Sequence, residues 1–158
     1  MSKFFYFICL FSFEISAQDV ACLMNSLEGQ FDWKMWNYDQ TTLKRSGERI
    51  AHFGVDSLNL LIEESFDDST IQMNGLIGWN NVDSTFYAVS VFNVDPGPHL
   101  MTGRLISDFE IEFLESNSGN IHLLTVVDKN QHHWTSQTKS KSGSYSQNDL
   151  KIVFVRKN

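Results

Sequence analysis

Short segments in which apolar and polar residues alternate recur along most of the chain, and this pattern constrains the fold more than any other feature. In the first of them, single polar residues separate Phe31, Trp33 and Met35. Successive side chains of a strand point to opposite faces, so the pattern predicts a strand with one buried and one solvated face. Ten strands are predicted in this way, at about residues 30–35, 48–53, 58–62, 73–80, 85–92, 100–106, 108–114, 121–127, 132–138 and 150–156.

The fourth predicted strand, Met73 to Asn80, is the centre of the pattern. Gly75 and Gly78 interrupt it, and glycine inside a strand indicates strong coiling or the close approach of another group. A four-residue loop after this strand would place Trp79 opposite Phe86 in the next one. One apolar face would then continue across the hairpin.

The order of the predicted elements indicates an all-β fold. Ahead of the strands, Asp19 to Leu27 predicts one short helix, with Asp19 as its N-cap and four apolar residues near one face. Ten short strands without helices between them predict an antiparallel up-and-down β-barrel. A two-sheet β-sandwich uses the same local signals and is the alternative.

Length and charge limit the chain to one domain and a few functional classes. The sequence has 158 residues, 42% of them hydrophobic, and a formal charge of −7. This composition is ordinary for a single domain, predicted at residues 18–158, that can bury a core without a disulfide or metal. A net negative charge without a basic stripe argues against nucleic-acid binding. No apolar run approaches the roughly 20 residues of a membrane-spanning helix.

The first 17 residues have the features of a signal peptide. Lys3 precedes the apolar run Phe4 to Phe13, and Ile15-Ser16-Ala17 resembles a cleavage site. We therefore expect cleavage after Ala17 and a secreted or periplasmic protein. Removal of this segment would leave Cys22 without a cysteine partner in the chain, either as a small buried side chain or as a site of lipid attachment.

Three short motifs resemble known families. Leu27-Glu28-Gly29-Gln30-Phe31 is similar to the Leu-x-Gly-x-Trp opening of lipocalin-like chains, with Phe31 in the place of the aromatic residue. The segments at 76–80 and 151–156 resemble parts of a bacterial family known as domain of unknown function 1579. The resemblance covers about residues 20 to 157. It implies a lipocalin-like (calycin) barrel, often exported, with no established activity and no catalytic residues.

The sequence lacks the signatures of common catalytic and metal sites. We find no phosphate-binding glycine loop, no Gly-x-Ser-x-Gly elbow and no His-Glu-x-x-His pair. His132 and His133 are adjacent and would point to opposite faces of a strand, and His52, His99 and His122 are isolated. We therefore assign no metal site, no cofactor and no catalytic residue.

Arg104 is the most informative ionisable residue, because its orientation depends on one turn. A two- or four-residue turn after it would pair it with Ile111 and turn it inward, where it would need Glu64 or an acidic ligand group as partner. A three-residue loop would instead turn Met101, Gly103 and Leu105 inward. The sequence alone does not decide between these two registers.

Aromatic residues with a polar edge complete the candidate binding residues. Trp33, Trp79, Tyr87 and Trp134 could line a pocket or simply fill a small barrel. For Trp134, a loop at 128–131 would place it opposite Thr125. Together with Arg104, these four are the candidate ligand-binding residues.

The predicted function is binding of a small hydrophobic or amphipathic molecule by a non-enzymatic, exported barrel. One alternative is a cavity enzyme of the isomerase or cyclase type, which a strongly shifted pKa in the cavity would favour. The other is a filled barrel that binds a protein partner through an apolar outer patch. The sequence does not define the oligomeric state.

Overall fold

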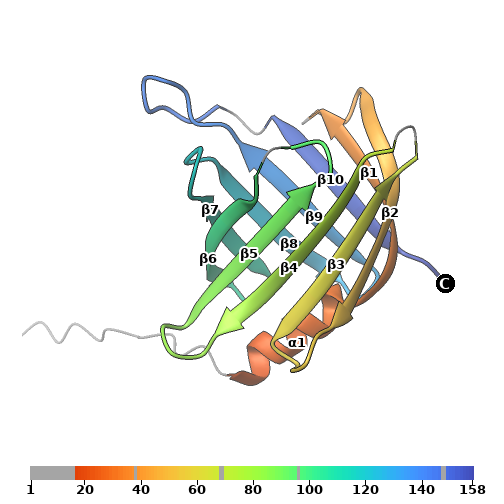
Figure 1. The fold of residues 1–158 in the computed structure, drawn as a ribbon, viewed down its shortest axis with the longest axis vertical. Helices are drawn as coiled ribbons and strands as arrows, with labels where there is room; N and C mark the ends of the chain where they lie inside the picture. Colours follow the sequence, from red (N-terminus) through yellow and green to blue (C-terminus); the bar gives the residue numbers. More distant parts are fainter. Residues whose placement is uncertain (1–16, 38, 68–69, 96, 147–148) are drawn as a thin grey trace, which may run out of the picture.

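The computed structural model describes residues 17–158, except for residues 38, 68–69, 96 and 147–148. It contains a closed antiparallel β-barrel of ten strands and one helix at its N-terminal end (Figure 1). Residues 1–16 of the predicted signal peptide lie outside the described part. The elements are α1 (Ala17–Leu27), β1 (Gly29–Asn37), β2 (Leu43–Phe53), β3 (Asn59–Phe66), β4 (Gln72–Asn80), β5 (Thr85–Phe92), β6 (His99–Ser107), β7 (Glu110–Glu115), β8 (Ile121–Asp128), β9 (Gln131–Gln137) and β10 (Leu150–Arg156).

Each strand pairs with its neighbours in the sequence, and β1 pairs with β10 to close the barrel. This is the up-and-down order that consecutive hairpins produce, and it confirms the predicted barrel over the sandwich. Closure leaves none of the ten described strands with an unpaired edge. The inner face of every strand therefore contributes to a single interior.

Helix α1 covers one end of the barrel (Figure 1). Its apolar face is buried in the same core as Trp79 and Phe86, and it consists of Val20, Leu23, Met24 and Leu27, as predicted. The helix begins at Ala17, so Asp19 lies in the first turn and is not the N-cap. Cys22 is exposed, so its expected burial is wrong.

The β4–β5 hairpin has the predicted register, whereas the β8–β9 hairpin does not. Trp79 lies opposite Phe86, which confirms the first prediction. Trp134 lies opposite Leu124 and not Thr125, because the register shifts between Val126 and Asp128. A bulge of this kind changes which residues face each other. Trp134 consequently shares the inner face with Leu124.

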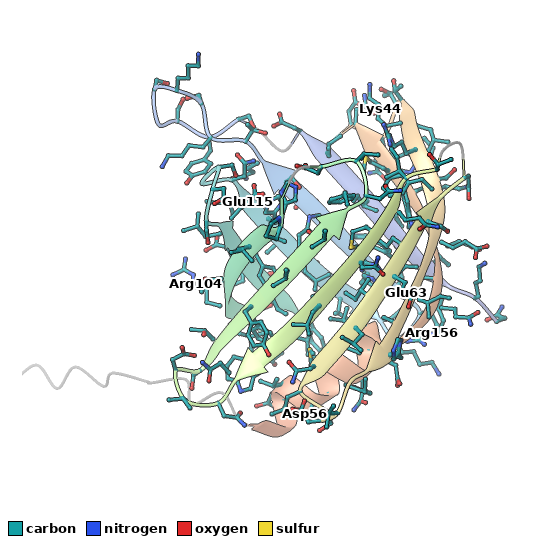
Figure 2. The ribbon with its side chains drawn as sticks, viewed as in Figure 1. Lys44, Asp56, Glu63, Arg104, Glu115 and Arg156 are labelled. Carbon is teal, nitrogen blue, oxygen red and sulfur yellow. The ribbon has the colours of Figure 1, made fainter. Side chains whose placement is uncertain are left out.

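Arg104 points out of the barrel, so the sequence-derived register that would turn it inward is wrong and the other register is correct. Its guanidinium binds Glu112 at 2.8 Å on the outer face, and its side chain is 74% exposed (Figure 2). The register instead pairs Leu105 with Ile111, with a shift before Ser107. Gly103 faces inward, and a Cβ at this position would lie 2.6 Å from the ring of the buried Phe113. The alternative set of inward residues is thus the correct one.

Candidate ligand cavity

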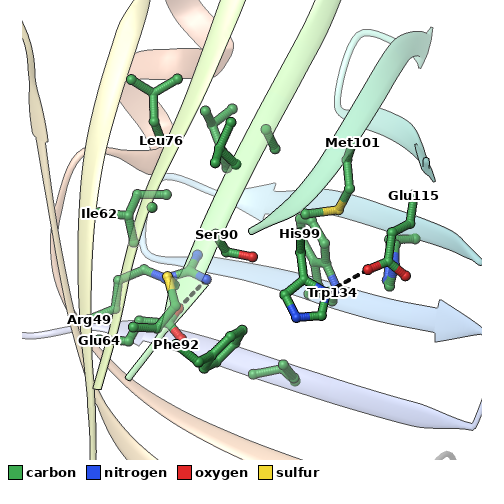
Figure 3. A pocket seen from close by; sticks show the side chains of 17 residues that line it. Arg49, Ile62, Glu64, Leu76, Ser90, Phe92, His99, Met101, Glu115 and Trp134 are labelled. Carbon is green, nitrogen blue, oxygen red and sulfur yellow. Dashed lines mark hydrogen bonds and ion pairs between the residues drawn. The ribbon is translucent and has the colours of Figure 1, made fainter. Parts of the chain in front are cut away.

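The barrel interior holds a cavity of about 190 Å³ in its half away from α1 (Figure 3). The cavity exists because small residues occupy inward positions of two adjacent strands. Gly75 on β4 lies opposite Ser90 on β5, and Ala88 is the next inward residue of β5. Nearer to α1, the inward residues Trp79 and Phe86 are large and fill the space.

Most of the cavity wall is apolar. Residues from strands around the barrel contribute to this lining, so an occupant would be surrounded on several sides. The apolar part includes Ile62, Met73, Ile77, Ala88, Met101 and Trp134. Apart from Ser90, the polar side chains fall into two groups, which lie on different parts of the wall (Figure 3).

The first polar group is the ion pair of Arg49 on β2 and Glu64 on β3. Both side chains are 9% exposed, and Arg49 Nε donates a 2.5 Å hydrogen bond to Glu64 Oε1. Arg49 Nη1 lies 3.2 Å from Nε2 of His132 on β9. Because arginine only donates, His132 Nε2 accepts this bond, and its proton lies on Nδ1. Among the described residues, Nδ1 has no hydrogen-bond partner.

The second polar group joins β6, β7 and β8 around the carboxylate of Glu115. His99 Nδ1 lies 2.6 Å from Glu115 Oε1, and His122 Nε2 lies 3.8 Å from Oε2. Glu115 Oε2 also accepts hydrogen bonds from Ser118 and from Asn120. The Glu115 carboxylate is therefore buried but well satisfied.

The surroundings shift the pKa values of these groups in different directions. Hydrogen bonds to Glu115 and then to Asp95 raise the pKa of His99, because they favour the imidazolium. Burial lowers the pKa of His122 and lowers that of His132 further, with Arg49 adding to the effect on His132. Burial alone would raise the pKa of Glu115, but hydrogen bonds from Ser118 and His99 outweigh it and lower the pKa.

The structure brings one of the five candidate binding residues to the cavity. Trp134 lines it, and its ring lies next to those of Phe113 at 5.6 Å and His122 at 5.4 Å. Trp33 and Trp79 point inward but are buried in the core away from the cavity lining. Tyr87 alternates with the inward residues of β5 and hydrogen-bonds Asn59, and Arg104 lies on the outer face, so neither contributes to the cavity lining.

Sequence reasoning missed the polar residues that the cavity contains. The sequence motifs do not mark Arg49 or Glu115, they leave His122 as an isolated histidine, and they give Glu64 a role only as a partner for Arg104. A signal was present, because each of these residues occupies an inward position in a strand. Glu64, for example, follows Leu60 and Ile62 at two-residue spacing. A charged residue in the apolar register indicates a polar group inside a barrel.

Among the described residues, no group of three or more histidine, cysteine, aspartate or glutamate side chains is placed to hold a metal ion. Within the same part of the chain, no helix is long and apolar enough to cross a membrane.

Comparisons with known proteins give a fold and no family. No family model matches the chain, and no curated protein matches it. The resemblance to domain of unknown function 1579 therefore stays a prediction. Among solved structures, a redesigned β-barrel matches with a TM-score of 0.46 and 16% identity, covering 86% of this chain and 96% of that one.

A second solved structure is a protein of unknown function from the DUF3598 family of Nostoc punctiforme PCC 73102. It matches with a TM-score of 0.50 and 12% identity, over 83% of this chain. The match covers 47% of that protein, so this chain spans about half of its length. At this identity the similarity shows the barrel fold alone.

Proposed function

We propose that this barrel binds a small, uncharged and mostly apolar molecule in the cavity beside Trp134. The observation that carries the proposal is the composition of the cavity wall. It is largely apolar, and every cation in it already has a carboxylate partner. This refines the hydrophobic or amphipathic ligand expected from the sequence.

The cavity volume sets the size of the ligand. Pockets for drug-sized molecules usually measure about 300–1,000 Å³, and an apolar cavity of about 150 Å³ takes benzene. At about 190 Å³, this cavity suits a molecule of roughly six to ten non-hydrogen atoms, such as a single substituted ring. The indole of Trp134 offers such a ring a flat apolar neighbour.

The charges of the cavity favour a neutral ligand. Arg49 is compensated by Glu64, and the His99 imidazolium is compensated by Glu115. Burial lowers the pKa of His122, which favours its neutral form. A charged ligand would therefore find no unpaired opposite charge, and burying an unpaired ion costs several kcal/mol. A neutral molecule avoids this cost.

The contacts of the ionisable groups do not favour the alternative of a cavity enzyme. Glu115 accepts hydrogen bonds from three different side chains, and His99 directs both ring nitrogens at carboxylates. A general acid or base needs to reach its substrate within hydrogen-bond distance. These two groups are occupied with each other and with their neighbours.

We also infer that the chain is exported before it binds its ligand. The support is the sequence of residues 1–17, with its basic residue, its apolar run of ten and its small-residue end. Mass spectrometry of protein expressed with its full N-terminus in a bacterial host would test this. Export predicts a mature chain that begins at Gln18 in the periplasm or the medium, and an uncleaved cytoplasmic chain would contradict it.

The binding proposal is tested with three probes of similar size and different charge. Benzyl alcohol, benzoate and benzylammonium are titrated into the protein, and binding is followed by chemical shifts of the methyl groups of Met73 and Met101, which line the cavity. We expect benzyl alcohol to bind at least about tenfold more tightly than either ion, which corresponds to about 1.4 kcal/mol.

Matched variants locate the binding. Ser90→Leu and Ala88→Leu fill the cavity and should abolish binding of benzyl alcohol. Val91→Leu changes the next residue of β5, which is 45% exposed on the outer face, and should leave binding unchanged. Absence of binding in the unmodified protein, or equal binding in folded Ser90→Leu and Ala88→Leu variants, would contradict the proposal.

A further inference from the structure

His99, the first residue of β6, lies at the entrance of the cavity. It lines the cavity and also two surface hollows, one beside Asp95 and Asn117 and one beside Arg45 and Phe66. The His99 ring packs edge-on against Phe92, with ring centres 5.7 Å apart. His99 therefore separates the interior from solvent.

Both ring nitrogens of His99 face carboxylates. Nδ1 lies 2.6 Å from Glu115 Oε1, and Nε2 lies 2.9 Å from Asp95 Oδ2. A carboxylate only accepts hydrogen bonds, and a neutral imidazole has a single N–H. With a neutral ring, one nitrogen lone pair would face a carboxylate oxygen at hydrogen-bond distance. The geometry thus requires the doubly protonated imidazolium.

These two hydrogen bonds connect parts of the chain that are not adjacent in the sheet. Asp95 follows the end of β5, Glu115 is the last residue of β7, and β6 lies between these strands. We call the three residues Asp95, His99 and Glu115 the clamp. While His99 is charged, the clamp ties the end of β5 to β7 across the cavity entrance.

We propose that proton binding by His99 controls access to the cavity. The imidazolium holds Asp95 and Glu115 together and narrows the entrance, and loss of one proton breaks one of the two bonds and widens it. The clamp would regulate the entry and release of the ligand that we propose for this cavity, and this regulatory role rests on the proposed function. The opening itself can be measured without a ligand.

Loss of the proton should release Asp95 and keep Glu115 bound. The Glu115 side chain is 9% exposed, so leaving it without the His99 donor would be costly. The Asp95 side chain is 40% exposed and can be hydrated instead. The remaining proton therefore stays on Nδ1, and the bond from Nε2 to Asp95 is lost.

The neighbouring charged groups influence the pH at which His99 loses its proton. Asp95, Glu115, His122 and Arg45 are the ionisable groups that face the entrance from the end of β5 and from β7, β8 and β2. The two carboxylates raise the pKa of His99 above its ordinary value of 6.5, while burial lowers that of His122 below it. The pKa values of the two histidines are therefore shifted in opposite directions, and the variants described below assign the change to His99.

The test measures access of a small nitroxide to the cavity. The protein is labelled with ¹³C in its methionine methyl groups, and the relaxation caused by dissolved nitroxide is recorded from about pH 5.5 to about pH 9. Met73 and Met101 line the cavity, while Met24 lies on the buried face of α1, is fully buried and is the internal reference. We expect the relaxation of Met101 to rise at least about twofold as His99 loses its proton, with no change at Met24.

Three variants assign the change to the clamp. His99→Gln is uncharged and should show the high relaxation at every pH. Asp95→Asn removes one of the two carboxylates, so the rise in Met101 relaxation should move to lower pH. This variant provides the test if His99→Gln does not fold. His52→Gln alters an exposed histidine on β2 and should behave as the unmodified protein.

Two results would overturn the proposal. One is a Met101 relaxation that does not depend on pH in the unmodified protein. The other is the same pH dependence in His99→Gln or an unmoved one in Asp95→Asn. A pH-dependent entrance in a protein that binds no benzyl alcohol would overturn the proposed function and leave the clamp intact, so the two failures are distinguishable.

Discussion

The guanidinium carbon of Arg49 lies 3.7 Å from the ring centre of Phe154 inside the barrel. This cation–π contact and the ion pair with Glu64 allow a positive charge to be buried next to an apolar cavity. Arg49, Phe154 and His132 form one packed unit, because the His132 ring stacks on Phe154 with centres 4.5 Å apart. Changes to any of these residues should therefore affect stability.

Loss of one partner of the Arg49–Glu64 ion pair should strongly lower the stability of the protein. Glu64→Leu leaves a buried guanidinium without its carboxylate, and we expect the free energy of unfolding to fall by about 3–5 kcal/mol. The double variant Arg49→Met, Glu64→Leu removes both charges and should recover most of this loss. Urea denaturation measures both values, and equal stability of the single and double variants would contradict the expectation.

His132 should make the protein less stable in acid. Burial lowers its pKa in the folded state below 6.5, so below that pH the unfolded chain binds a proton that the folded chain does not. Stability due to this group is complete above pH 6.5 and is lost on acidification, by at most about 1.4 kcal/mol per pH unit. Urea denaturation of His132→Phe should show a weaker acid dependence, whereas His52→Gln should keep that of the unmodified protein.

His99 should have the opposite effect on how stability depends on pH. Its pKa is raised in the folded state, so its contribution is fully present below pH 6.5 and is lost as the pH rises through the folded-state value. Because the side chain is about one-third exposed, we expect less than about 1 kcal/mol. The difference in unfolding free energy between the unmodified protein and His99→Gln should shrink from mildly acidic to alkaline pH. A difference that grows instead would show that the clamp does not hold the imidazolium.

Removing side-chain volume from the wall should change ligand size preference. Met101→Ala enlarges the cavity, so we expect 2-naphthylmethanol to gain affinity relative to benzyl alcohol. Leu100→Ala removes similar volume from the next residue of β6, which is 43% exposed, and should not alter the preference. Competition titrations measure the ratio, and an equal shift in both variants would place the binding site elsewhere.

Gly47 should tolerate no side chain. A Cβ at this position of β2 would lie 1.9 Å from the carbonyl oxygen of Ser65 and 2.7 Å from the indole of Trp33. Gly47→Ala forces backbone or Trp33 to move, and we expect a loss of about 1–3 kcal/mol in unfolding free energy. Gly97→Ala is the control, since among the described residues, its chain neighbours aside, no heavy atom lies within 4 Å of the added Cβ. Similar midpoints in thermal unfolding for both variants would contradict the prediction.

The sequence predicted the elements well because alternation and turn residues are local properties. Every predicted strand has a counterpart in the barrel, and the apolar face of α1 was identified from its helical spacing. Prediction failed at the bulges. The shift between Val126 and Asp128 changes the expected partner of Trp134. The shift between Leu105 and Ser107 lies at the turn whose length left two registers open for Arg104. Phe109 likewise lies in a turn and is 60% exposed.

The amino-acid sequence by itself determined an all-β chain with one covering helix, because strand and helix periodicity follow from the geometry of each short segment. Only the tertiary structure decided which polar residues meet inside. Arg49 and His132 are 83 residues apart, and His99, Glu115 and His122 come from three different strands. Their encounters depend on register and barrel closure, which are set by the summed packing of all ten strands and the cost of leaving a buried charge unpaired.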